Sequence, residues 1–166
     1  MANGYANNAY PYTPAVGLMN GLNKSCEMIL NEGLENVFAR HHRIAQGVRL
    51  AVQAWGLRLC ANDPSVYSDT VSAIKTPVNF NATDVVTIAA EKYGVAFGVG
   101  LGEVAGKVFR IGHLGSLTDV MALSGIATAE MCLKDLGLNI ELGSGVSAAQ
   151  DYYRNNSTIE LNVAAE

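Results

Sequence analysis

Arg110 is the residue whose type and setting most favour chemistry in this sequence. It lies between Phe109 and Ile111 in an alternating apolar run that is typical of a strand. A charged side chain in such a run is rarely buried without a partner. The residues alone leave two interpretations open. The guanidinium points to solvent or pairs with a structural acid, or it binds a substrate carboxylate through two parallel hydrogen bonds, which arginine does better than lysine.

The segment before this arginine is rich in glycine, and Gly100 to Ala105 fits the pattern G-x-G-x-x-A. Dinucleotide binding requires a helix to begin at this loop, whereas residues 107–111 alternate like a strand. A phosphate-binding P-loop requires Ser or Thr after its lysine, and here Val108 follows Lys107. We therefore expect a flexible, glycine-bent loop between two strands and no nucleotide site.

The other reactive residue types indicate no catalytic or metal site. His41 and His42 are adjacent on an expected helix and point to different faces, while His113 follows a strand, so we expect surface or core roles for all three. Residues 143–145 lack the spacing of a nucleophile elbow. The three cysteines are far apart and have apolar neighbours, which predicts reduced core residues: Cys26, Cys60 and Cys132.

Composition bounds the class of protein. The chain has 166 residues, 49% of them hydrophobic, which suits one domain or a domain with an appended segment. A net charge of −4 argues against a nucleic-acid-binding protein. No apolar stretch reaches the roughly 18 residues of a membrane span. The first residues do not form a signal peptide and the last three are not a peroxisomal signal, so we expect a cytoplasmic protein.

Five helices are expected where apolar residues recur every three or four positions, at 18–32, 34–55, 82–93, 117–136 and 148–153. The first should present an apolar face of Leu18, Leu22, Cys26 and Ile29. The fourth should be capped by Ser116 and bury a stripe of Val120, Leu123, Ala127 and Met131.

Short strands are expected at 57–60, 70–76, 95–97 and 107–111. At four helix ends a glycine is followed by an apolar residue, the pattern of a left-handed cap whose next residue packs back on the helix: Gly33-Leu34, Gly56-Leu57, Gly94-Val95 and Gly137-Leu138. Helices alternating with short strands predict an α/β or α+β domain, in which helices cover a small sheet.

Two strings resemble class V aminotransferases that depend on pyridoxal phosphate (PLP), of the serine–glyoxylate and alanine–glyoxylate type. One is Tyr-Pro-Tyr-Thr-Pro at residues 10–14, followed by a helix. The other, at residues 100–115, contains Gly-Lys-Val-Phe-Arg-Ile-Gly. Residues 32–41 also match the second helix of that family, and Gly-Ser-Gly-Val at 143–146 is similar to the tail of its serine–glyoxylate branch. The resemblance covers nearly the whole chain.

The resemblance implies the C-terminal part of a fold-type I enzyme with a small, mostly antiparallel sheet. Residues 1–35 would end the large cofactor domain, residues 36–142 would form the small domain, and residues 143–166 would be a tail. Arg110 would bind the substrate α-carboxylate. Tyr10 and Thr13 would reach the PLP phosphate of the neighbouring subunit in a homodimer acting on amino acids and 2-oxo acids.

The family's Schiff-base lysine lies in a Ser-Gln-Lys context that none of the five lysines shares: Lys24, Lys75, Lys92, Lys107 and Lys134. PLP chemistry requires that lysine. The sequence therefore predicts no catalytic residue in this chain and no activity of the chain alone. Two alternatives remain: a stand-alone non-catalytic domain that pairs with a full-length subunit, and a module that binds a small carboxylate through Arg110.

Overall fold

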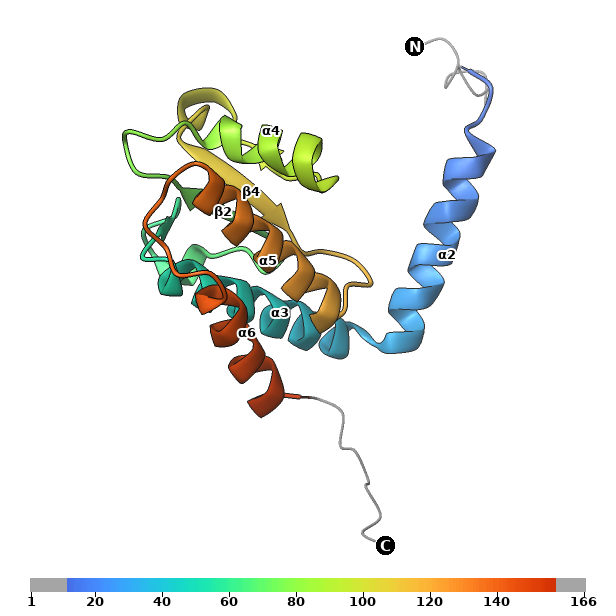
Figure 1. Ribbon diagram of the computed structural model, residues 1–166. Helices are drawn as coiled ribbons and strands as arrows, with labels where there is room; N and C mark the ends of the chain where they lie inside the picture. Colours follow the sequence, from blue (N-terminus) through green and yellow to red (C-terminus); the bar gives the residue numbers. More distant parts are fainter. Residues whose placement is uncertain (1–11, 158–166) are drawn as a thin grey trace, which may run out of the picture. The chain divides into compact units, whose positions relative to one another are not determined.

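The computed structural model describes residues 12–157, and the chain divides into two compact units between Phe38 and Ala39. The first unit holds helix α2 (Val16–Glu32) and the start of α3 (Leu34–Ala54). The second unit holds the rest of α3 and every later element (Figure 1). Among residues 12–157, no helix is long and apolar enough to cross a membrane.

Helix α2 forms where the apolar period predicts it, but it buries none of its residues. Leu18 is 78% exposed and Leu22 is 66% exposed. Cys26 on the same helix is exposed, so the prediction of a core cysteine is wrong there, while Cys132 is buried as expected. Apolar neighbours on a helix therefore predict an apolar face, but not what covers that face.

The second unit is built on a four-stranded antiparallel sheet in the order β1-β2-β4-β3. The strands are β1 (Arg58–Leu59), β2 (Val71–Lys75), β3 (Gly98–Val99) and β4 (Val108–Gly112). The expected fold class, a small antiparallel sheet with helices, is confirmed. The third strand begins three residues later than predicted, because its two residues are defined by pairing with β4 and not by their own propensity.

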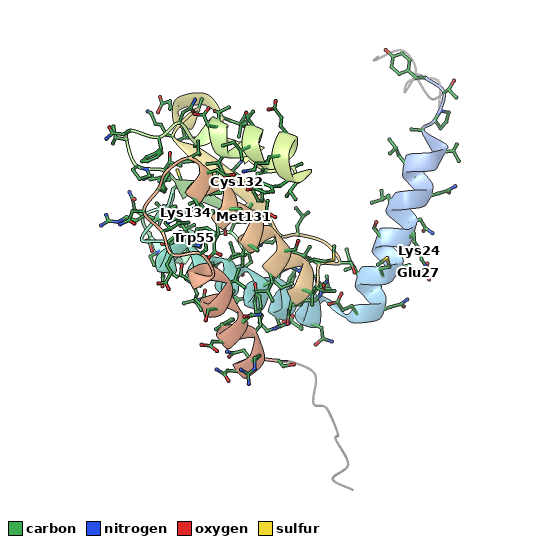
Figure 2. All side chains as sticks on the ribbon, viewed as in Figure 1. Lys24, Glu27, Trp55, Met131, Cys132 and Lys134 are labelled. Carbon is green, nitrogen blue, oxygen red and sulfur yellow. The ribbon has the colours of Figure 1, made fainter. Side chains whose placement is uncertain are left out.

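Three helices complete the second unit: α4 (Ala82–Tyr93), α5 (Asp119–Asp135) and α6 (Ser144–Asn155). In Figure 1, α5 lies between α4 and α6. Side chains from α3 to α6 pack with Ile74, Phe109 and Ile111 of the sheet into one apolar core. Figure 2 shows Trp55 at the end of α3 and Cys132 on α5, both members of this core.

The buried face of α5 differs from the predicted stripe. Val120 is 75% exposed and Met131 is 36% exposed. The buried positions lie on another face of the helix: Ala122, Ile126, Thr128, Ala129, Glu130, Cys132 and Leu133. This helix is apolar over most of its circumference, so periodicity alone does not select a face. Its cap is Thr118, whose side chain accepts a hydrogen bond from the Met121 amide, and not Ser116.

All four predicted cap glycines have positive φ angles: Gly33, Gly56, Gly94 and Gly137. Gly33 nevertheless has a ψ of 134°, outside the left-handed region, and Leu34 after it is exposed, so the predicted cap is wrong there. At three of them the following amide hydrogen-bonds to a carbonyl five or six residues back, as from Leu57 to Val52 and from Leu138 to Leu133, each at 3.0 Å. This local hydrogen bonding fixes the direction in which the backbone leaves each of these helices.

Close packing of α6 on α3 depends on Gly47. A Cβ atom at this position would lie 2.3 Å from the ring of Tyr153. The Tyr153 hydroxyl donates to the carbonyl of Ile44 at 2.8 Å. Arg43, whose guanidinium carbon lies 5.5 Å from the centroid of the same ring, pairs with Asp119 at the start of α5.

Candidate functional site

Arg110 lies on β4, opposite Ala73 of β2 on one side and Gly98 of β3 on the other. Side chains alternate across a strand, so the buried Phe109 and Ile111 point into the helix-covered core and Arg110 points to the other face. The arginine is half-buried there, between two of the smallest residues. This placement gives a cation on an apolar sheet without burying it in the core.

The Arg110 side chain is held along β3. Its Nε donates to the carbonyl of Val99 at 2.9 Å. A Cβ atom on Gly98 would lie 3.0 Å from that Nε and 3.3 Å from Nη2. The missing side chain at Gly98 therefore gives the guanidinium the space it occupies, and the Val99 carbonyl fixes its orientation.

The two terminal nitrogens of Arg110 have no partner within the described part of the chain. No ion pair formed among residues 12–157 includes this arginine. Of the two interpretations left open by the sequence, pairing with a structural acid is therefore not what the structure contains. A guanidinium anchored through Nε presents its Nη groups in the planar arrangement that binds a carboxylate through two parallel hydrogen bonds.

The loop between β3 and β4 is a tightly bonded turn and not the loosely bent one expected. Gly100 donates to the Val108 carbonyl at 3.0 Å, and Lys107 donates to the Val104 carbonyl at 3.1 Å. A Cβ on Gly100 would meet the Val104 carbonyl oxygen. A 3-10 turn and then β4 follow Gly100, in place of the helix that a dinucleotide loop needs.

Sequence reasoning missed a buried polar cluster where β2 begins and β4 ends. Ser72 Oγ lies 3.0 Å from His113 Nε2, and His113 Nδ1 lies 3.1 Å from the backbone carbonyl of Asp69. Burial lowers the pKa of His113 to about 4, so the ring is neutral, with Nδ1–H donating and Nε2 accepting. Ser72 is only 3% exposed and the third group is a carbonyl, so this arrangement is structural and not a hydrolytic triad.

Asp69 ties this cluster to helix α3. Its carboxylate accepts from Arg49 at 2.5 Å and lies 3.1 Å from His42 Nδ1. Burial alone would raise the pKa of Asp69, but the hydrogen bonds from Arg49 and His42 outweigh burial and lower it. His42 therefore has a structural partner, and His41 accepts a hydrogen bond from the Gly115 amide at 3.0 Å. These are the ordinary roles that the sequence favoured for histidine.

Of the two residues expected at a cofactor phosphate, Tyr10 lies outside the described residues. Thr13 is exposed just before α2. None of the five lysines is buried. Lys24 pairs with Glu27 at 3.0 Å, as labelled in Figure 2, and Lys92 pairs with Asp135 at 2.7 Å. Among the described residues, Thr13 is therefore the one member of the expected phosphate pair that can be placed, and each of the five lysines is exposed or partly exposed.

Comparison with known proteins shows which class of protein the chain is similar to. No protein-family model matches the chain. The chain is 69% identical over 165 residues to an L-aspartate–glyoxylate aminotransferase of Paracoccus denitrificans, covering 99% of this chain and 42% of that protein. It is 54% identical over 149 residues to a serine–glyoxylate aminotransferase of Hyphomicrobium methylovorum, covering 90% and 37%.

A solved pyridoxamine–pyruvate aminotransferase from Mesorhizobium loti matches with a TM-score of 0.82 and 34% identity, over 89% of this chain and 38% of that one. The fold with its arginine-bearing sheet is thus that of an aminotransferase C-terminal domain. The chain is similar to the C-terminal part of serine– and aspartate–glyoxylate aminotransferases. It spans about two fifths of the length of these curated relatives.

Proposed function

We propose that this chain supplies the substrate-carboxylate site of a PLP-dependent transaminase that transfers an amino group to glyoxylate. The observation that carries the proposal is the state of Arg110: its Nε is bonded to the Val99 carbonyl and its two Nη groups have no partner among residues 12–157. The resemblance favours serine or alanine as amino donor. The sequence does not separate these two from aspartate, which is the donor in the name of the Paracoccus relative.

Arg110 would act by orientation and charge. Amino donor and glyoxylate each carry a carboxylate next to the reacting carbon, so one guanidinium serves both half-reactions. Two parallel N–H···O bonds fix the plane of that carboxylate and therefore the position of the reacting carbon. Gly98 and Val99 hold the guanidinium beforehand, so little rotamer freedom is lost on binding.

The remaining parts of the site belong to the intact homodimer. PLP, when bound, stores the amino group between the two half-reactions. Tyr10 and Thr13 would donate their hydroxyls to the PLP phosphate of the neighbouring subunit. The Schiff-base lysine would come from the length of the relatives that this chain does not span. Residues 1–35 would then complete the large domain and residues 36–142 the small one. Of the predicted tail at residues 143–166, α6 packs into the core of the second unit.

A hybrid enzyme tests this proposal. The C-terminal part of the Paracoccus aminotransferase is replaced by this chain, and transamination of glyoxylate is measured with serine, alanine and aspartate. The hybrid should be active, and Arg110→Lys should lower kcat/KM for both donor and glyoxylate by roughly ten- to a hundredfold, because one charge-assisted hydrogen bond is worth about 1.5–3 kcal/mol. Arg110→Leu should lower it further, with PLP content unchanged.

Arg154 provides the matched control, since it is an exposed arginine at the end of α6. Arg154→Lys and Arg154→Leu should leave both kinetic constants within about twofold of the parent hybrid. If Arg110→Leu also stays within twofold for both substrates, Arg110 does not bind the carboxylate. If the hybrid folds, binds PLP and still shows no turnover with any of the three donors, the proposed function is wrong.

A further inference from the structure

A second candidate site lies at the β1 edge of the sheet, in a cavity of about 480 Å³. Residues of α3, of β1 and of the following loop line it, together with Lys75 from β2, and Arg110 is not among them. Its charged lining residues are all cations, Arg49, Arg58 and Lys75, and its uncharged polar ones are Gln53, Asn62 and Tyr67. No acidic side chain lines it, in a protein whose net charge is −4.

Two of these cations are neighbours on adjacent strands. Arg58 and Lys75 are directly opposed in the antiparallel register of β1 and β2. Like charges in that position destabilise a strand pair. None of the ion pairs within residues 12–157 includes either residue, so no carboxylate of the described chain offsets the repulsion. An anion bound between them would turn this repulsion into attraction.

The third cation, Arg49, is held in place by the surrounding protein. The Arg49 side chain is 7% exposed and lies under Tyr67, with its guanidinium carbon 5.5 Å from the ring centroid. Its Nη groups bond to Gln46, to the Ser68 carbonyl and to Asp69. Its Nε is buried and has no hydrogen-bond partner. Because this nitrogen is enclosed by protein atoms and both Nη groups are already bonded, the free cationic donors of the cavity are Arg58 and Lys75.

We propose that this cavity binds a small organic dianion, either a dicarboxylate or a phosphate monoester. Arg58 and Lys75 balance its two charges, and the polar side chains of Gln53, Asn62 and Tyr67 line the same cavity. The volume lies within the range of small-molecule sites. The assignment is independent of the transaminase proposal, because it uses none of the residues proposed to contact amino acid, glyoxylate or PLP.

The test uses the full chain, titrated with succinate and with inorganic phosphate at constant ionic strength. Binding is followed by calorimetry and by the rise in melting temperature that ligand binding produces. Arg58→Gln and Lys75→Gln should each weaken binding about tenfold or more, because each removes a charge-assisted contact. Arg58→Lys keeps the charge and should retain most of the affinity. Arg154→Gln, with the same charge loss on α6, should bind like the parent.

The two glutamine variants also carry a readout that a merely structural role would not give. Without anion, Arg58→Gln and Lys75→Gln should melt at or above the parent temperature, since each removes the cross-strand repulsion. At equal concentrations of succinate or phosphate, Arg58→Gln and Lys75→Gln should gain less stability than the parent, Arg58→Lys and Arg154→Gln. Preference for succinate or for phosphate decides between the two kinds of dianion.

Three results would overturn the proposal. One is equal affinity for both probes in the parent and in Lys75→Gln. Another is an equal stabilisation by acetate at the same ionic strength, which would indicate a general salt effect. The third is no heat of binding and no melting shift with up to tens of millimolar of either probe, because a built site with two unpaired cations should bind more tightly than that.

Discussion

Substitution of Glu130 tests how α6 is attached to the domain. Glu130 lies on α5 and is 2% exposed. Its Oε1 accepts from the indole Nε1 of Trp55 at 2.9 Å and from the amides of Gly145 at 2.6 Å and Val146 at 3.3 Å. Its Oε2 accepts from the Gly143 amide at 2.9 Å. One buried carboxylate thus binds the end of α3 and the free amides at the start of α6.

The expected loss of unfolding free energy follows from these four hydrogen-bond donors. A hydrogen bond to a charged group contributes about 1.5–3 kcal/mol, but burying the carboxylate offsets much of the sum. Glu130→Ala leaves all four donors unpaired in a dry site, so we expect a loss of about 3–5 kcal/mol. Glu130→Gln keeps one acceptor oxygen but points an NH2 group at donors on the other side, so we expect a loss of about 2–3 kcal/mol. Either loss is a large fraction of the unfolding free energy of a typical domain, which is about 5–15 kcal/mol.

Urea unfolding measures this change directly. Trp55 is the only tryptophan of the chain and it donates to the substituted group, so its fluorescence reports on the site, while far-UV circular dichroism reports on the helices. Glu141→Gln is the matched control, because Glu141 is exposed near the same helix start, and it should stay within about 0.5 kcal/mol of the parent. A loss below about 1 kcal/mol in Glu130→Ala would refute the reasoning, since such a value is expected of a surface residue.

Three further outcomes are expected. The chain alone should show no turnover of glyoxylate with serine, alanine or aspartate, and borohydride reduction in the presence of PLP should give no stoichiometric single-site adduct on peptide mapping. The exposed apolar residues of α2 should cause self-association that Leu22→Lys reduces, and light scattering showing a clean monomer of the parent over a wide concentration range would contradict this. The folded-state pKa of His113, about 4, lies below its usual 6.5, so the unfolded chain binds more protons between these values. Stability from this residue should therefore be present above pH 6.5 and decline as pH falls toward 4, and urea unfolding of His113→Gln should show a smaller decline over that window.

Local signals predicted most elements of the fold. Gly56 and Gly137 end their helices as expected, because a left-handed cap depends on residues within one turn of the chain. The cap of α4 is equally local, since the Asn81 side chain accepts a hydrogen bond from the Thr83 amide two residues later. Most of the wrong predictions concern long-range packing, such as which face of α5 is buried and where β3 pairs with β4, although the predicted cap of α5 also lies two residues too early. Neither of these two packing features follows from the residues of one segment.

The candidate sites likewise combine residues that the sequence reveals with distant partners that it does not. Arg110 is visible in the sequence as a cation in an apolar strand, but the residues that hold it lie 11 and 12 positions earlier, on a strand too short to be recognised. The Glu130 cluster joins residues 75 positions apart. An acidic residue within the apolar run of α5 is the signal that was available for it, since a buried carboxylate requires donors nearby.

The two faces of the sheet explain how one domain can be stable and still present an unpaired cation. Phe109 and Ile111 contribute to a core closed by helices on one face, so folding does not depend on anything bound to Arg110. On the other face, Ala73 and Gly98 flank the arginine, and its Nη groups have no hydrogen-bond partner among residues 12–157. A guanidinium that is oriented but not neutralised contributes little to the stability of the domain and much to binding an incoming carboxylate. Arg110→Leu should therefore leave the unfolding free energy nearly unchanged while it removes substrate affinity in the hybrid enzyme, and this separation of the two effects is what distinguishes a binding residue from a structural one.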